Sequence, residues 1–118
     1  MKVIYEDNHI IIVNKQAGEI VQGDKTGDRT LADDVKAYIK EKYAKPGDVF
    51  LGVVHRLDRP VSGVVVFART SKALSRLNDM FRTGKIQKTY QAIVSATEKS
   101  VATPDGEWVT VDTWLTRH

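Results

Sequence analysis

The chain has 118 residues, of which 42% are hydrophobic and 28% are charged, and this composition is typical of a single globular domain. The absence of cysteine excludes a disulfide framework, a thiolate metal site and a thiol nucleophile. Acidic residues follow the N-terminus closely, and the longest apolar run, residues 64–68, is far too short to span a membrane. We therefore expect a soluble cytoplasmic protein with no membrane partner.

The formal net charge of +3 is unevenly distributed along the chain. Residues 55–88 contain eight basic and two acidic residues, a net charge of +6, so the rest of the chain carries −3. A segment of this kind attracts a polyanion such as nucleic acid. A solvated surface without a binding role would produce the same imbalance, so charge alone leaves both interpretations open.

The first third of the chain predicts two strands, a loop and a helix. Residues 3–7 (VIYED) and 9–13 (HIIIV) predict short strands around the turn-prone pair Asp7-Asn8. Residues 15–29 contain three glycines and alternating charges, which predicts a loop. Thr30 predicts the N-cap of a helix that begins at Leu31 and ends at residues 45–47 (KPG), because apolar residues then recur at helical spacing.

The middle of the chain predicts a buried strand and a second helix. Residues 64–69 (VVVFAR) predict a strand too apolar to have a solvent-exposed face, and Ser71 predicts the N-cap of a helix that Gly84 ends. One side of this helix is apolar and the other is mostly basic, so we expect the first to pack on a sheet. The apolar side consists of Ala73, Leu74, Leu77, Met80 and Phe81, and the outer side of Lys72, Arg76, Asp79 and Arg82.

The last third predicts two more strands, residues 88–94 (KTYQAIV) and a candidate in residues 107–118. Strands and helices that follow one another without regular alternation favour an α+β fold. We therefore expect a mixed or antiparallel sheet with two amphipathic helices.

Residues 55–63, HRLDRPVSG, place four charged or titratable side chains between two apolar runs. The protein-kinase HRD loop is excluded because no Gly-rich loop or DFG motif accompanies it, and Ser62 does not lie in a GxSxG elbow. The three histidines match no metal-ligand spacing. What remains is Asp58 among arginines. A neighbouring arginine would keep its carboxylate ionised and usable as a nucleophile, or the pair would only hold a turn.

The segment HRLDRPVSGVVVFA, the basic helix after it and KTYQAIV closely resemble the RluA family of pseudouridine synthases. Residues 14–18 (NKQAG) resemble the first motif of that family. Val61 stands where the family usually has Thr, and Gln16 stands in place of the usual Pro. The resemblance implies that residues 1–118 are the N-terminal portion of a catalytic domain, with no separate accessory domain. The family's catalytic domain continues into a segment with a further basic residue that pairs with the aspartate.

This resemblance also implies residue roles, with Asp58 as the catalytic carboxylate and Tyr90 stacking on the uracil as a second catalytic residue. The carboxylate would act on the sugar C1′, on the base C6 or in elimination to a glycal, and the sequence leaves these routes open. No metal or other cofactor is implied. Arg56 would hold or replace the flipped base, and His55, Ser62 and Gly63 would complete substrate binding. The residues expected to contact RNA phosphates are Arg59, Lys72, Arg76, Arg82, Lys85 and Lys88.

Two hypotheses follow from these observations. The first is an isomerase that converts uridine to pseudouridine in ribosomal or transfer RNA, the sequence naming neither the RNA nor the uridine. The second is that the 118-residue chain is an RNA-binding or structural portion of such an enzyme that does not catalyse alone. We also expect this chain to self-associate through an exposed sheet edge.

Overall fold

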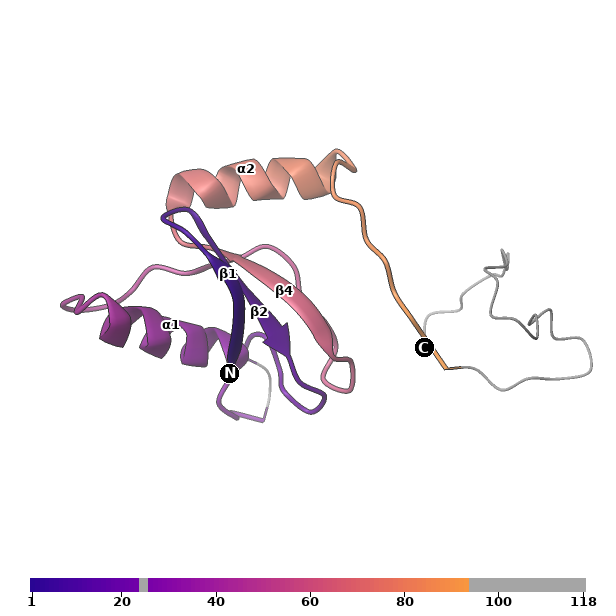
Figure 1. Ribbon diagram of the computed structural model, residues 1–118, viewed down its shortest axis with the longest axis horizontal. Coiled ribbons are helices and arrows are strands. Elements are labelled where there is room, and N and C mark those ends of the chain that lie inside the picture. Colours follow the sequence, from indigo (N-terminus) through magenta and orange to yellow (C-terminus); the bar gives the residue numbers. More distant parts are fainter. Residues whose placement is uncertain (24–25, 94–118) are drawn as a thin grey trace, which may run out of the picture. The chain divides into compact units, whose positions relative to one another are not determined.

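A computed structural model describes residues 1–23 and 26–93 and has the predicted α+β architecture (Figure 1). The chain divides into two units, residues 1–87 and 88–118. The first unit contains all the elements of the described residues. In chain order these are β1 (Lys2–Glu6), β2 (Ile10–Lys15), α1 (Leu31–Lys42), β3 (Gly52–Val53), β4 (Gly63–Ala68) and α2 (Ser71–Arg82).

The four strands form one antiparallel sheet in the order β1-β2-β4-β3. The predicted pair of strands around Asp7 is confirmed, and the carboxylate of Asp7 accepts hydrogen bonds from the backbone N–H groups of His9 and Ile10 at 2.7 and 2.8 Å. Strands β2 and β4 are central and pair over six residues, from Ile10 opposite Ala68 to Lys15 opposite Gly63. The sheet therefore brings the end of β2 beside the start of β4.

The core lies between α1 and one face of the sheet. The predicted start of α1 is confirmed, because Thr30 and Asp33 form a reciprocal capping box at its N-terminus. The helix ends at Lys42, before the predicted end at residues 45–47. The buried cluster combines odd-numbered strand residues, one residue of the β2–α1 loop and one face of the helix. Its members are Ile11, Val13, Val65 and Phe67 from the strands, Val21 from the loop, and Leu31, Ala32, Val35 and Ile39 from α1.

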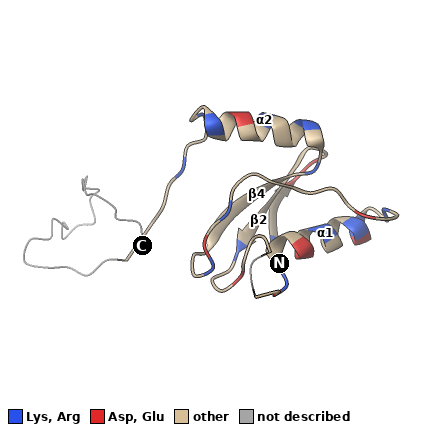
Figure 2. Ribbon diagram, turned by 180° about the vertical axis from the view of Figure 1, so that it is seen from behind, with Lys and Arg blue, Asp and Glu red and all other residues tan. Residues whose placement is uncertain are grey.

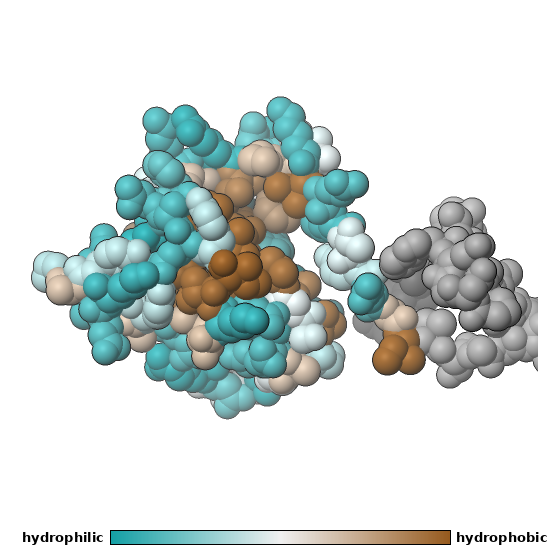
Figure 3. All heavy atoms as spheres, viewed as in Figure 1, coloured by the Kyte–Doolittle hydropathy of each residue, from teal (hydrophilic) through white to brown (hydrophobic). Residues whose placement is uncertain are grey.

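The other face of the sheet is only partly covered. Helix α2 packs over one end, where Gly52 lies so close to Leu74 that an added Cβ would stand 2.8 Å from its methyl carbon. Farther along β4, Val64 is 59% exposed. Figure 3 shows the apolar side chains gathered beside α2 over the strands. The prediction that this strand has no exposed face was therefore wrong, because α2 reaches only its Ala68 end.

The N-cap of α2 is Thr70, not Ser71 as predicted. Thr70 has extended dihedral angles (φ −134°, ψ 156°), and its hydroxyl accepts a hydrogen bond from the N–H of Ala73 at 3.1 Å. Ser71 is already the first helical residue. An N-cap residue has a non-helical backbone and accepts from an N–H two or three residues later, so Ser71, whose backbone is already helical, is excluded.

The strand predicted for residues 88–94 is also not formed in its described part. Residues 88–93 have no regular secondary structure, and their side chains are exposed. An alternating pattern supplies two side-chain faces, but a strand also needs a partner backbone to complete its hydrogen bonds. Residue 94 and the candidate strand in residues 107–118 lie outside the described residues.

Candidate active site

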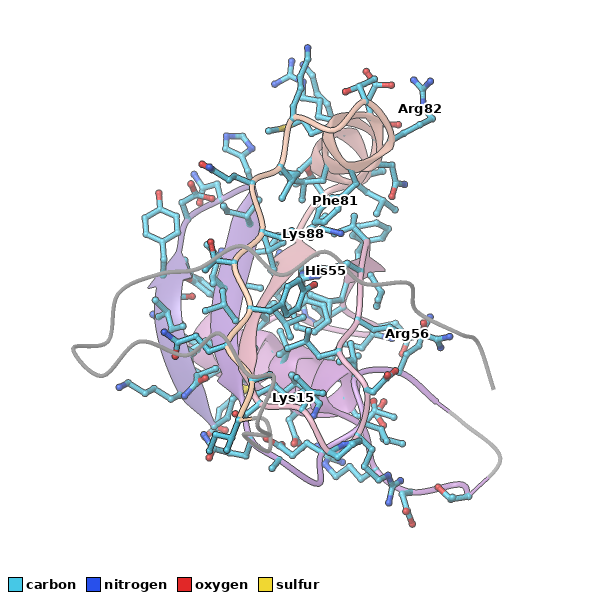
Figure 4. All side chains as sticks on the ribbon, turned by 90° about the vertical axis from the view of Figure 1, so that its right-hand side faces the viewer. Lys15, His55, Arg56, Phe81, Arg82 and Lys88 are labelled. Carbon is cyan, nitrogen blue, oxygen red and sulfur yellow. The ribbon has the colours of Figure 1, made fainter. Side chains whose placement is uncertain are left out.

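The motif residues lie on the loop that connects β3 to β4, residues 54–62. Side-chain exposure alternates along its first half: His55 and Leu57 are partly buried, whereas Arg56 and Asp58 are exposed. Leu57 packs against the hydrophobic core. Figure 4 shows Arg56 directed away from the sheet. An extended backbone turns successive side chains to opposite sides, so anchoring Leu57 in the core turns its two charged neighbours outward.

The backbone around Asp58 is held by several hydrogen bonds. A four-residue turn is closed by the N–H of Val61, which donates to the carbonyl of Asp58 at 2.9 Å. The carbonyl of Arg59 accepts from the N–H of Gly18 at 2.8 Å. Gly18 has φ +94°, in the left-handed region that favours glycine. The two segments that resembled family motifs, residues 14–18 and 55–63, are therefore hydrogen-bonded to each other.

Lys15 lies beneath the same turn and is fully buried. Its Nζ atom lies 3.1, 3.0 and 2.5 Å from the carbonyl oxygens of Asp58, Arg59 and Val61, and 3.2 Å from that of Gln16. Removing an ammonium group from water costs several kcal/mol unless other dipoles replace the lost hydration. The carbonyl groups of the turn supply those dipoles. Burial lowers the pKa of Lys15, an effect that the carboxylates of Glu19 and Asp58 oppose.

His55 holds the start of the loop against the sheet and α2. Its Nε2 accepts a hydrogen bond from the backbone N–H of Val66 at 3.0 Å, so the neutral ring carries its proton on Nδ1. The ring stacks on Phe81, with centroids 5.0 Å apart and an interplanar angle of 28° (Figure 4). This imidazole thus contacts both β4 and α2.

The carboxylate of Asp58 has no hydrogen bond or ion pair with the residues that the structure describes. The arginine pair expected from the sequence is not formed there, because Arg59 donates to Asp28 at 3.0 Å instead. The alternative in which Asp58 serves only to hold a turn through an arginine loses its basis, since the ammonium of Lys15 holds the turn through backbone carbonyls. The fold uses the backbone of Asp58 and leaves its side chain available.

Ser62 and Gly63 lie where the loop joins β4. Ser62 is exposed, whereas Gly63 has φ +144° and lies against the side chain of Leu57. A Cβ at position 63 would combine a strained dihedral with a 3.4 Å contact to Leu57. The sequence requirement for glycine here is conformational, and the expected role of both residues in substrate binding stays a prediction.

The residues expected to contact RNA lie at several places. Lys72, Arg76 and Arg82 are exposed on α2, along which basic residues recur (Figure 2), and Arg82 forms an ion pair with Asp79. Lys85 is exposed in the segment after the helix. Lys88 and Tyr90 belong to the second unit, where both side chains are exposed, Tyr90 by 66%. Their relation to Asp58 stays a prediction.

Asp58 does not line either of two cavities in the first unit, whose volumes are about 290 and 270 Å³. The smaller one lies between the β1–β2 turn and α2, beside Lys72 and Arg76. Within residues 1–23 and 26–93, no three His, Cys, Asp or Glu side chains lie close enough together to hold a metal ion. Neither α1 nor α2, the helices of the described part, is long and apolar enough to cross a membrane.

Lys15 was not predicted as a site residue, although the pattern of β2 contained the signal. Ile11 and Val13 are buried, and position 15 continues the same face of the strand. A lysine at a position that alternation assigns to the core must find several acceptors, and residues 58–61 provide them. Burial of a charged residue was thus predictable, but its partners were not.

Comparison with known proteins identifies the class to which this fold and loop belong. Residues 9–116 match the RNA pseudouridylate synthase family, which covers most of the chain. The chain belongs to this family, and the resemblance to RluA-type enzymes is confirmed.

Individual relatives are bacterial enzymes. The ribosomal large subunit pseudouridine synthase C of Buchnera aphidicola (subspecies Acyrthosiphon pisum) is 37% identical over 93 residues, covering 79% of this chain and 28% of the relative. The protein of the same name from Escherichia coli K12 is 36% identical over 92 residues, covering 78% of this chain and 27% of the relative. The chain thus spans between a quarter and a third of the length of these relatives.

A solved structure supports the same fold. Human RNA pseudouridylate synthase domain containing 4 superposes with a TM-score of 0.60 at 24% identity, covering 71% of this chain and 30% of that one. At this level of identity the similarity concerns the fold. It agrees with an antiparallel sheet carrying two helices as part of a pseudouridine synthase domain.

Proposed function

We propose that the protein is an RNA pseudouridine synthase in which Asp58 is the catalytic carboxylate. The observation that carries this proposal is the contrast at one residue: the backbone of Asp58 is bound by Lys15 and Val61, while its exposed carboxylate has no partner among the described residues. A carboxylate that forms no hydrogen bond or ion pair within the described residues is available for chemistry. Membership of the family supplies the reaction, an isomerisation of uridine.

The reaction breaks the N1–C1′ bond of uridine and forms a C5–C1′ bond, while C5 loses a proton and N1 gains one. No atom is lost overall and no oxidant is needed. The carboxylate would attack C1′ or C6, or assist elimination to a glycal. In each route it acts as an ionised group, so exposure to water before RNA binds is compatible with its role.

The remaining roles follow the same proposal. Arg56 is exposed, lies two residues from Asp58 on the outward side of the loop, and would occupy the space left by the flipped nucleotide. Tyr90 would stack on the extruded uracil. The basic residues of α2 would contact phosphates through charge and shape rather than through base identity.

The substrate we propose is a uridine in large-subunit ribosomal RNA, because the two bacterial relatives are named as ribosomal large subunit enzymes. Transfer RNA is the other substrate to test. Pseudouridine mapping in RNA from cells that lack the gene separates them. Loss of a modification in large-subunit ribosomal RNA supports the ribosomal substrate, whereas loss confined to transfer RNA contradicts it.

A second candidate function is RNA binding without catalysis by the 118-residue chain. It is favoured by the position of Asp58, which lines neither of the two cavities described above. RNA bound by this chain without turnover, while a longer chain of the same protein is active, would support this second function.

The decisive experiment measures tritium release from RNA labelled at C5 of uridine, comparing Asp58→Asn with Asp79→Asn. Both changes remove one negative charge from an exposed side chain, but only the first lies on the anchored loop. We expect Asp58→Asn to lower turnover by at least about a thousandfold without loss of folding, and Asp79→Asn to remain active. Unchanged turnover in Asp58→Asn would overturn the assignment.

A further inference from the structure

Two side chains hold the Asp58 loop at its two ends: Lys15, which has no role in the proposed function, and His55, for which the family resemblance implies only substrate binding. At the end of the loop, the Nζ atom of Lys15 gathers the carbonyl oxygens of residues 58, 59 and 61 within 2.5–3.1 Å. These acceptors are 43 to 46 residues away in sequence. One of them belongs to Asp58 itself, so a shift of the ammonium displaces the residue that carries the carboxylate.

At the start of the loop, His55 takes the place of a backbone acceptor. The β3–β4 register sets Gly52 opposite Ala68 and Val53 opposite Phe67, so the next position, opposite Val66, belongs to Val54. The strand stops at Val53, and the N–H of Val66 donates to Nε2 of His55 instead of to a backbone carbonyl. The imidazole therefore accepts the hydrogen bond that a longer β3 would accept from β4. The backbone after Val53 can then turn away from the sheet toward Asp58 without leaving the N–H of Val66 unbonded.

We propose that Lys15 and His55 are positioning residues that fix the location of the Asp58 carboxylate by fixing both ends of its loop. The consequence for turnover rests on the proposed function, whereas the effect on the loop backbone does not. Rate depends steeply on the position of a reacting group, since a displacement of about 1 Å can cost about a hundredfold. A loop with an exposed, unpartnered carboxylate needs such anchors, because its side chain makes no contact that would hold it.

The surroundings of Lys15 define what its charge does. The carboxylates of Glu19 and Asp58 favour its protonated form, while burial and the cation of Arg59 oppose it. An ammonium directs its protons at the surrounding carbonyls, whereas a neutral amine turns a lone pair toward at least one of them. The carbonyl groups of the turn should therefore sense the protonation of Lys15 directly.

The first test replaces Lys15 by Met, with the exposed Lys36→Met on α1 as the matched control. We expect amide hydrogen exchange at Val61 and Gly18 to accelerate by about tenfold or more in Lys15→Met, because both N–H groups bind carbonyls that Lys15 holds. Amides in the core of α1 should keep their rates. Equal acceleration everywhere would mean that Lys15 is only a stability residue, and no change at Val61 would also overturn the proposal.

A second measurement needs no variant. Carbonyl ¹³C shifts of Asp58, Arg59 and Val61 are followed in the wild-type chain from pH 7 to pH 11. We expect the three shifts to move together in one step, with a midpoint below the usual lysine pKa, because burial lowers that of Lys15. Carbonyls that do not titrate together would contradict the contact.

The His55 anchor is tested with a pair of substitutions. His55→Gln retains a side-chain acceptor, whereas His55→Phe retains only the ring that stacks on Phe81. We expect faster exchange at the N–H of Val66 in His55→Phe and near-normal exchange in His55→Gln. Equal behaviour of the two variants would mean that the hydrogen bond does not position the loop.

Turnover then separates positioning from RNA binding. If the proposed function holds, Lys15→Met and His55→Phe should lower kcat by about tenfold to a hundredfold with little change in KM, because neither removes a basic side chain from the surface. For His55 this result would favour positioning over the substrate binding expected from the family resemblance. A rise in KM alone would overturn the positioning role. Should the wild-type chain show no turnover, the proposed function of this chain fails, and the exchange and titration results still decide the loop anchors.

Discussion

Residues 55–63 and helix α2 both carry charged side chains on the surface, but the fold treats them differently. In the loop, the backbone is bound by side chains and N–H groups from another part of the chain, which fixes the position of Asp58. In α2, the backbone bonds are internal, and Lys72 and Arg76 have no hydrogen bond or ion pair within the described residues. Fixed geometry suits a reacting group, whereas long mobile side chains suit phosphates in many arrangements.

The largest effect expected to distinguish α2 from the loop is the loss of RNA affinity when basic residues of α2 are removed. We expect the double variant Lys72→Gln/Arg76→Gln to weaken RNA binding roughly thirtyfold near physiological salt, about 2 kcal/mol, since each lost phosphate contact removes counterion release. The slope of log K against log salt should fall by about one unit per charge removed. Filter binding or fluorescence anisotropy across a salt series measures both.

The control removes the same charge from the other helix. Lys36 and Lys40 lie on the exposed side of α1. The double variant Lys36→Gln/Lys40→Gln should weaken RNA binding much less than the α2 variant. Equal losses in the two double variants would mean that net charge, not the α2 surface, attracts RNA. The contrast between loop and helix would then lose its functional meaning.

The next effect concerns the anchored loop. Gly18 has φ +94° and donates to the carbonyl of Arg59, so Gly18→Ala should cost about 1 to 2 kcal/mol of unfolding free energy. An added Cβ would meet nothing within 4 Å, which leaves the dihedral angle as the cause. Gly23→Ala is the control, because its φ is not in the left-handed region. Similar losses in urea unfolding of both variants would contradict the conformational explanation.

Removing the N-cap of α2 should have a smaller effect on stability, and it tests whether the cap is Thr70 rather than the predicted Ser71. We expect Thr70→Ala to destabilise the protein by about 1 kcal/mol, since its hydroxyl binds the N–H of Ala73. Ser71→Ala should change stability by no more than about 0.5 kcal/mol, because Ser71 is exposed at the first helical position. Thermal unfolding distinguishes the two, and a larger loss in Ser71→Ala would restore the cap predicted from the sequence.

Local sequence patterns predicted much of this fold. Features that depend on contacts between distant residues could not be predicted. The helical spacing after Thr30 and the turn at Asp7 are encoded within a few residues, so α1 and the β1–β2 pair were predictable. The order β1-β2-β4-β3 was not, because it depends on pairing between segments some fifty residues apart. The choice between Thr70 and Ser71 depends on one backbone dihedral, which two adjacent capping residues do not determine.

In the candidate site, too, the local feature was predictable from the sequence and the distant contacts were not. The motif predicted Asp58, since its residue types and spacing are local. The partner of its turn was predicted as an arginine but is the ammonium of Lys15, because the fold brings the end of β2 beneath the loop. Residues 88–93 alternate as a strand would, yet form none. The sequence therefore indicated the candidate residue Asp58, but it did not indicate the side chains that hold the loop around it.

The smallest predicted effect is on the unfolding free energy and concerns Glu6, whose charge forms an ion pair within the fold. The carboxylate of Glu6 accepts hydrogen bonds from Lys42 and Tyr38, and these lower its pKa. A carboxyl group with a pKa lower in the folded than in the unfolded state stabilises the protein above the unfolded pKa. That stability is lost as the pH falls through the folded pKa. We expect Glu6→Gln to lose less than about 1 kcal/mol at pH 7 and to differ little from wild type near pH 2.

Urea unfolding at the two pH values measures this difference, and RNA binding of the same variant completes the comparison. Glu6 lies at the junction of β1 and α1, so its loss should alter stability and leave the phosphate contacts proposed for α2 intact, apart from a small change in net charge. The α2 variants should show the reverse, with weaker binding and unchanged stability. If Glu6→Gln weakened binding as much as Lys72→Gln/Arg76→Gln, the division between charges that hold the fold and charges that meet RNA would fail.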